Sequence, residues 1–228
     1  MLGSPPTLSE RLDKPNRDLV RATTIRKRER RVLPAGTPIA RIHRLAGGYA
    51  TAWNELRRDG PTTTSRFDHH PPPARVHATH SIAYLTYGKT QFLGALAEAF
   101  QRRGGGVRPI DRVDNSPAVT LFELADEIAL LNLDSGWVTR AGGNQAITSG
   151  ARGRAREWAR AIYAEHDDVM GLAYRSSVWA RGRCIALWDR GASAFPKAPL
   201  TTRLLADDAM DIPLDRAAAA LGTRIVTP

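Results

Sequence analysis

The sequence SIAYLTYGKTQFLGALAEAFQRR, residues 81–103, predicts a strand that is followed closely by a helix. Its first seven residues are rich in β-branched and aromatic side chains, which favour a strand. Further on, the apolar residues recur at helical spacing and share one face, formed by Phe92, Leu93, Leu96 and Phe100. The three glycines at 104–106 then end the helix. This segment therefore predicts a strand and a helix that pack against a common core.

Similar patterns predict further elements on both sides of this segment. Alternating apolar and polar residues predict a strand at 39–45, and strand-like segments follow at 171–176 and 184–188. Helices are expected from a cap at Thr148 or Ser149 to about Glu165, and at 214–221. Residues 118–133 suit either a helix or a strand, with a strand favoured at 128–133. Because strands and helices interleave irregularly, we expect an α+β fold rather than a doubly wound sheet.

Composition limits the classes of protein to which the chain can belong. With 228 residues, of which 42% are hydrophobic, one compact domain with a tail is expected. The 33 Lys and Arg against 23 Asp and Glu give a net charge of +10, which favours an anionic partner: a nucleic acid, a phosphorylated small molecule or an acidic protein. Cys184 is the only cysteine, so intramolecular disulfides and cysteine-rich zinc modules are excluded.

The chain has no apolar run near the ~18–20 residues that a membrane span requires. Its first thirty residues mix acidic and basic side chains and contain no apolar stretch typical of a secretory signal. We therefore expect a soluble, cytoplasmic protein without a membrane partner.

Residues 1–37 differ in composition from the rest of the chain. They are interrupted by prolines and end in the basic run RKRERR at 26–31. We expect a basic N-terminal arm with at most one short helix, and a globular domain over 38–228. A solvated tail, or packing onto a partner chain, is favoured for this arm over direct binding of nucleic acid.

Several common enzyme motifs are absent from the sequence, including the phosphate-binding GxxxxGK[ST], GxGxxG, GxSxG and HExxH. Four histidines fall within twelve residues: His69, His70, His77 and His80. Prolines 71–73 interrupt this group, and Asp68 is its only nearby carboxylate. A surface loop is therefore favoured over a metal site, and no metal is expected.

A dispersed set of polar residues carries the chemical interest of the chain: Arg41, Arg44, Arg66, Tyr84, Tyr87, Glu98 and Ser176. Taken singly, each has an ordinary explanation. An arginine on a strand usually lies on a solvated face, and Glu98 lies nearly opposite the apolar stripe of its helix, where glutamate is simply a good helix former.

Taken in order, these residues and their neighbours resemble the RES domain, a family named for its Arg, Glu and Ser and known mostly as toxins of bacterial toxin–antitoxin pairs. The resemblance spans about residues 38–190. It rests on ARIHR at 40–44, SRFD at 65–68, AYLT at 83–86 with ALAEAF at 95–100, and GLAYRS at 171–176. Each stretch is short, but their order and spacing match the family.

The resemblance assigns roles to particular residues. The arginine that precedes an aromatic residue corresponds to Arg66, the helical glutamate to Glu98, and the serine of the Tyr-x-Ser stretch to Ser176, next to which lies Ser177. Arg41 matches the early arginine of the first strand. The strand tyrosine is either Tyr84, which has the Tyr-Leu context but a gap to Glu98 about three residues longer than usual, or Tyr87, which has the usual gap.

The resemblance also implies a fold and an activity. RES domains look like ADP-ribosyltransferases, with mixed or antiparallel sheets and flanking helices. The family implies that the chain binds NAD as a substrate and breaks its nicotinamide–ribose bond. Water as acceptor gives an NAD glycohydrolase, phosphate an NAD phosphorylase, and a protein side chain an ADP-ribosyltransferase.

The residue types suit this chemistry. Glu98, when ionised, can stabilise the oxocarbenium-like ribose and accept a hydrogen bond from a ribose hydroxyl. Arg66 and Arg41 can hold the pyrophosphate. Tyr84 or Tyr87 can stack on nicotinamide, and Ser176 can orient a ribose or the amide.

Partners are implied by the family alone. A helix-turn-helix (Xre-like) antitoxin that masks the NAD cleft is expected, together with a possible homodimer. Two alternatives stay open: a basic nucleic-acid-binding protein, and an interaction module that keeps the fold without turnover.

Overall fold

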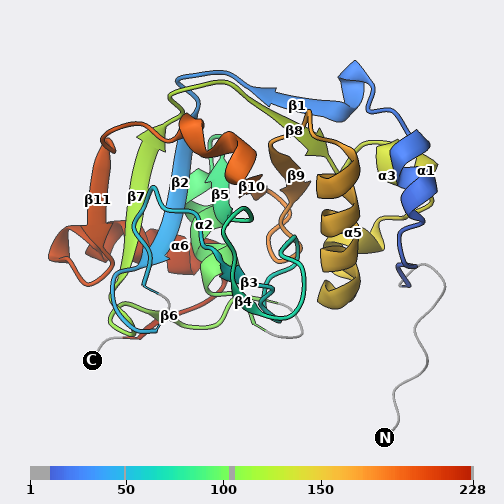
Figure 1. The fold of residues 1–228 in the computed structure, drawn as a ribbon. Coiled ribbons are helices and arrows are strands. Elements are labelled where there is room, and N and C mark those ends of the chain that lie inside the picture. The colour runs from blue at the N-terminus through green and yellow to red at the C-terminus, as the bar shows by residue number, and fades with distance from the viewer. Residues whose placement is uncertain (1–10, 49, 103–105, 227–228) are drawn as a thin grey trace, which may run out of the picture.

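The computed structural model describes residues 11–48, 50–102 and 106–226. Over these residues the central element is an eight-stranded mixed sheet (Figure 1). Its strands, in spatial order, are β1 (Arg30–Leu33), β8 (Ile128–Asn132), β9 (Gly171–Arg175), β10 (Arg183–Trp188), β5 (Ile82–Tyr87), β2 (Pro38–Arg44), β7 (Pro117–Glu123) and β11 (Thr201–Leu204). Only the pair β8 and β9 is parallel within this described sheet.

Helices and short strands surround the sheet. The α-helices are α1 (Arg17–Ala22), α2 (Gln91–Ala99), α3 (Trp137–Arg140), α4 (Ala146–Ser149), α5 (Arg152–Glu165) and α6 (Asp211–Leu221). The 3-10 helices are η2 (Lys27–Glu29), η3 (Asp189–Ala194) and η4 (Asp208–Met210). The short strands β3 (Asp59–Gly60) and β4 (Arg75–Val76) pair with each other, as do β6 (Ile110–Asp111) and β12 (Ile225–Val226).

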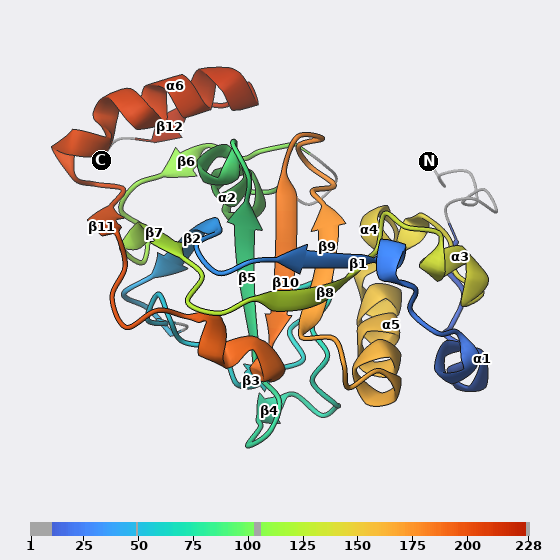
Figure 2. The same ribbon diagram turned by 90° about the horizontal axis from the view of Figure 1, so that it is seen from above.

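The core has apolar residues on both faces of the sheet. On β10, Cys184, Ala186 and Trp188 belong to the cluster that includes residues of α5, whereas Ile185 and Leu187 belong to a cluster on the other face. Helix α2 packs on β2 and β5, and α6 contacts α2 (Figure 2). The expected α+β architecture, a mixed sheet with flanking helices, is confirmed.

Most predicted elements are present with shifted ends. The strands predicted at 39–45, 81–87, 171–176 and 184–188 correspond to β2, β5, β9 and β10, and the ambiguous segment 118–133 contains the two strands β7 and β8. Helix α2 ends at Ala99, before the predicted glycines. Neither Thr148 nor Ser149 caps α5, because both belong to α4, and α5 begins at Arg152. Helix α6 begins at Asp211, three residues before its predicted start, and Gly222, with φ of 61°, ends it.

Residues 11–37 contact the rest of the molecule extensively. Helix α1 packs on α5, and β1 pairs with β8 at the edge of the sheet. Leu12, Val20 and Leu33 are buried in the two clusters beside these elements. This segment is therefore not a solvated tail. It contains the strand β1, which its charged composition did not predict. The domain division at residue 38 stays a prediction, and the part of the predicted arm before residue 11 lies outside the described residues.

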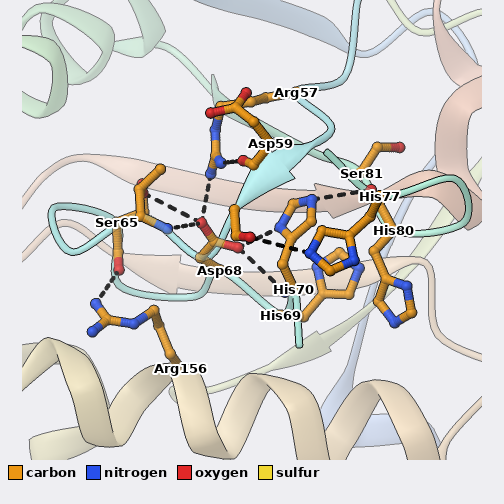
Figure 3. A network of polar contacts seen from close by, with 12 residues as sticks. Arg57, Asp59, Ser65, Asp68, His69, His70, His77, His80, Ser81 and Arg156 are labelled. Carbon is orange, nitrogen blue, oxygen red and sulfur yellow. Dashed lines mark hydrogen bonds and ion pairs between the residues drawn. The ribbon is translucent and has the colours of Figure 1, made fainter. Parts of the chain in front are cut away.

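Residues 72–76 of the histidine segment are exposed, but the prediction of a surface loop is wrong for three of its four histidines. His69, His70 and His77 are buried, and their rings gather with the ring of His80 (Figure 3). His70 Nδ1 donates to Asp68 Oδ1 at 2.5 Å, and Arg57 donates to Asp68 Oδ2 at 2.7 Å. The buried carboxylate of Asp68 thus binds side chains of this segment, although its three prolines are typical of an exposed loop.

Candidate functional site

A cavity of about 500 Å³ opens where β2 and β5 separate. The two strands pair only at Ile39 with Tyr87 and at Ala40 with Thr86. Beyond these pairs, Arg41 and Ile42 of β2 and Tyr84 and Leu85 of β5 line the cavity. A volume of this size is typical of small-molecule sites. The separation of β2 from β5, referred to below as the fork, therefore creates a ligand-sized space beside these strands.

Glu98 enters this cavity from α2 and is the one acidic side chain in the described cavity wall. It lies opposite the apolar stripe of its helix, as the sequence predicts, but that side faces the cavity. Burial raises the pKa of Glu98, while the hydrogen bond from Ser176 and the charges of Arg66 and Arg152 oppose that rise. Glu98 is thus a buried carboxylate whose charge depends on a few neighbours.

Ser176 fixes the orientation of this carboxylate. Its Oγ donates to Glu98 Oε1 at 2.5 Å and accepts the backbone N–H groups of Val178 and Trp179, both at 3.1 Å. Because those two donors occupy the Ser176 oxygen, its own hydrogen is directed to Glu98. Ser176 lies behind the cavity wall, whereas the neighbouring Ser177 is part of that wall. Its position favours a role in holding Glu98 over direct contact with a ligand.

Arg66 and Arg152 flank the glutamate from two different parts of the chain. Arg66 Nη1 donates to the Gly150 carbonyl at 2.5 Å, just before α5 begins. Arg152, the first residue of α5, donates from Nη2 to Gln101 Oε1 at 2.6 Å. Burial lowers the pKa of Arg66, and the charge of Arg152 lowers it further. Both guanidinium groups line the cavity.

Arg41 is almost completely buried in the wall on the β2 side. Its Nη1 donates to the carbonyls of Trp53 and Glu55, each at 2.7 Å. Burial lowers the pKa of Arg41 to about 10, so the group remains charged at neutral pH. These contacts hold the guanidinium in place while its other nitrogens stay available to a ligand.

The two candidate tyrosines occupy different environments because they lie an odd number of residues apart on a strand. Tyr84 lines the cavity, and its buried hydroxyl faces the Ser65 side chain and the Phe67 backbone without full hydrogen-bond geometry to either. Burial raises the pKa of this hydroxyl. Tyr87 packs against the cluster on the other face of the sheet and does not appear in the described cavity wall. The structure therefore brings Tyr84, and not Tyr87, to Glu98 and the arginines.

The sequence analysis did not identify four of the residues that line the cavity: Gln101, Arg108, Arg152 and Tyr174. The Tyr174 ring packs edge-on against Phe67, with 4.6 Å between the ring centroids. Arg152 is separated by more than fifty residues from Glu98, and no local pattern distinguishes it from the other arginines of α5. Only the tertiary fold brings it to the site.

No group of three or more His, Cys, Asp and Glu side chains in the described ranges is arranged to hold a metal ion. Within the same ranges no helix is both long and apolar enough to cross a membrane.

The fold and the cavity define an α+β protein whose cationic site lies in a forked mixed sheet beside one buried glutamate. The model of the RES domain family matches residues 38–215, and the chain belongs to this family. The resemblance drawn from the four short sequence stretches is thereby confirmed.

Among solved structures, the chain is similar to the M. tuberculosis MbcT–MbcA toxin–antitoxin complex. The identity is 12%, the TM-score is 0.47, and the match covers 82% of this chain and 90% of the other. A comparison with curated protein sequences finds no match.

Proposed function

We propose that the protein binds NAD in the forked-sheet cavity and breaks the nicotinamide–ribose bond, as the toxin of a bacterial toxin–antitoxin pair. The observation that carries this proposal is the buried Glu98, held by Ser176 and surrounded by arginines. A cavity with cationic walls suits a dinucleotide diphosphate, and a fixed carboxylate suits the positive charge that develops on the ribose. Membership of the RES family supports the same function.

The chemistry follows from the positions of the side chains. When the bond breaks, its electron pair leaves with nicotinamide, and the ribose becomes oxocarbenium-like. Ser176 donates one hydrogen bond to Oε1 of Glu98, and the carboxylate keeps further lone pairs that can accept a hydrogen bond from a ribose hydroxyl. The charges of Arg66 and Arg152 favour the ionised carboxylate that this role requires.

Other parts of the wall suit the rest of the substrate. Arg66 and Arg152 present planar guanidinium groups for the diphosphate. Tyr84 offers a ring for stacking on nicotinamide. These residues therefore fit NAD as substrate.

The acceptor after bond breaking is one of three classes. Water gives glycohydrolysis, phosphate gives phosphorolysis, and a protein side chain gives ADP-ribosylation. In the toxin role, a helix-turn-helix antitoxin of the Xre-like type covers the cavity, and the toxin forms a homodimer. These assignments rest on family membership.

The test measures NAD consumption by the purified protein, with and without phosphate, while the ribose-containing product is identified by its mass. Glu98→Gln keeps the size of the side chain but removes its charge, so turnover should fall by roughly a hundredfold or more. Glu127→Gln, at an exposed glutamate outside the cavity, is the matched control and should keep full turnover. Full turnover by a folded Glu98→Gln protein would exclude Glu98 from catalysis, and absence of NAD loss in the unmodified protein would favour an interaction module.

A further inference from the structure

The loop that carries Arg66 follows the cavity wall without regular secondary structure. Residues 61–68 lie between β3 and β4, and Thr64, Ser65 and Arg66 line the cavity. Among the described residues, no hydrogen bond between two backbone groups involves residues 62–66. Side chains that bind the loop backbone therefore determine how firmly the loop is held.

Arg156 of α5 binds this loop through two backbone carbonyls. Its Nη1 donates to the carbonyls of Thr63 and Ser65, each at 3.1 Å. Figure 3 shows the Arg156 side chain reaching from α5 to Ser65. In the part of the chain that the structure describes, neither carbonyl accepts a hydrogen bond from another residue. Because the donor is charged, these two bonds are stronger than bonds between neutral groups.

The same helix carries a cavity arginine, Arg152, one turn before Arg156. Residues four apart lie on the same side of a helix, so both arginines face the site from α5. Arg66 reaches back from the loop, and its Nη1 donates to the Gly150 carbonyl at 2.5 Å, two residues before Arg152. The loop and the start of α5 are therefore joined at two points, one made by Arg66 and the other by Arg156.

The ends of the loop are held by contacts that do not involve α5. Asp68 Oδ2 accepts the backbone N–H of Thr62 at 2.8 Å and a hydrogen bond from Arg57 Nη2 at 2.7 Å. Thr62 Oγ1 donates to Ser65 Oγ at 2.7 Å. Loss of the Arg156 side chain would leave these contacts in place. It would free the middle of the loop from α5, and the protein would keep its fold.

We propose that Arg156 is a positioning residue, which holds residues 63–65 on α5 and thereby aligns Arg66 with Arg152 in the cavity wall. Arg156 itself does not appear in the described cavity wall, so it acts through Arg66 and not by contact with a ligand. The consequence for NAD rests on the proposed function, in which Arg66 and Arg152 bind the diphosphate. The consequence for the loop does not.

Hydrogen exchange followed by mass spectrometry tests the contact with the loop. In Arg156→Gln, peptides that cover residues 61–67 should exchange roughly tenfold faster or more, because two hydrogen bonds from a charged donor are lost. Arg156→Lys keeps a charged donor on a shorter side chain and should give an intermediate rate. Arg154→Gln removes the same charge from α5, but Arg154 pairs with Glu157, so this control should leave the loop unchanged. Thermal unfolding checks that each variant folds.

A double-mutant cycle tests whether Arg156 acts through Arg66. Calorimetry measures the dissociation constant of NAD for the unmodified protein, Arg156→Gln, Arg66→Gln and the double variant. Arg156→Gln should weaken binding by roughly tenfold when Arg66 is present, and by less than about twofold when Arg66 has been replaced. A residue that only stabilised the fold would weaken binding equally in both backgrounds. Arg154→Gln should again have no effect.

The two measurements separate the positioning role from the proposed function. Faster exchange of the loop in Arg156→Gln, with no binding of NAD by any of the proteins, would support the positioning role while the proposed function fails. Unchanged exchange would overturn the positioning role, as would an unchanged affinity where NAD binds, or an equal loss of affinity in both backgrounds. Cleavage of NAD by the unmodified protein would support the proposed function in each of these cases.

Discussion

Ser176 acts on the ionisation of Glu98 through a single hydrogen bond. Its hydroxyl donates to the carboxylate and lowers the pKa that burial has raised. Ser176→Ala removes this donor, so the pKa of Glu98 should rise further. Activity that needs ionised Glu98 falls as the pH drops through this pKa. The acid limb of the pH–rate profile should therefore move to higher pH.

This prediction has a readout that a purely structural serine would not change. Ser193→Ala removes the hydroxyl of an exposed serine in η3 and serves as the control, with an unshifted profile. A fall in kcat for Ser176→Ala with the acid limb unmoved would contradict the assignment of Ser176 as the residue that positions Glu98.

The site residues differ in how far they could be predicted. Glu98 and Arg66 could be identified because each lies in a short stretch that matches the family pattern. The choice between Tyr84 and Tyr87 could not be made from spacing, since it depends on which face of β5 meets the fork. Arg152 could not be found, because the start of α5 reaches the end of α2 only in the folded protein.

At the scale of elements, the stability of the segment between β3 and β5 should depend on pH. It carries Arg66, and buried polar side chains hold it in place (Figure 3). Burial lowers the pKa of His69 to about 4, compared with about 6.5 in an unfolded chain. Between pH 4 and pH 6.5, His69 is protonated in the unfolded chain and neutral in the folded one. The stability that depends on neutral His69 is therefore complete above pH 6.5 and is lost as the pH falls towards 4.

The expected result is a fall in the free energy of unfolding of about 3 kcal/mol from His69 as the pH drops from 7 to 4. Burial lowers the pKa of His80 and of His43 too, so both add to the same trend. Denaturant unfolding across this pH range measures it, and His69→Phe should reduce the slope. An equal slope in His69→Phe would show that His69 does not titrate with unfolding.

The N-terminal elements provide a stability test with a matched pair of valines. Val20 on α1 is fully buried in the apolar cluster that includes residues of α5, whereas Val32 on β1 is 47% exposed. Val20→Ala should lower the free energy of unfolding by about 1–3 kcal/mol, because it removes buried methyl groups and leaves a gap. Val32→Ala should change it by less than about 0.5 kcal/mol. Equal, small effects in denaturant unfolding would show that α1 does not stabilise the core.

Elements whose apolar residues recur with a clear period could be predicted from the sequence. The strand β1 and the histidine segment could not. The strand β1 has the sequence RRVL, in which two arginines precede the apolar Val32 and Leu33, so that apolar and polar residues do not alternate. Its structure comes from pairing with β8, a contact that no local pattern encodes. The histidine segment was misassigned for a related reason. The partners of the buried His70 ring, Asp68 and the His80 carbonyl, are brought to it only by the fold.

At the scale of the whole molecule, the net charge of +10 is spread over regions with different roles. The basic residues of η2 precede β1, at one edge of the sheet, whereas the fork lies between β5 and β2. Four strand spacings separate β1 from β5, which corresponds to roughly 19 Å. The Debye length is about 10 Å at 0.1 M salt, so charges at this edge are largely screened from the cavity.

Added salt should therefore lower kcat/KM for the dinucleotide mainly by screening the cavity arginines. Arg152→Gln removes one of these charges and should flatten the dependence of kcat/KM on ionic strength. Lys27→Gln with Arg28→Gln removes two exposed charges from η2 and should leave the dependence unchanged. Steady-state rates from 0.05 to 0.3 M salt test this. If the η2 variant flattened the dependence as much as Arg152→Gln did, the attraction of substrate would come from the overall charge of the molecule rather than from its cavity.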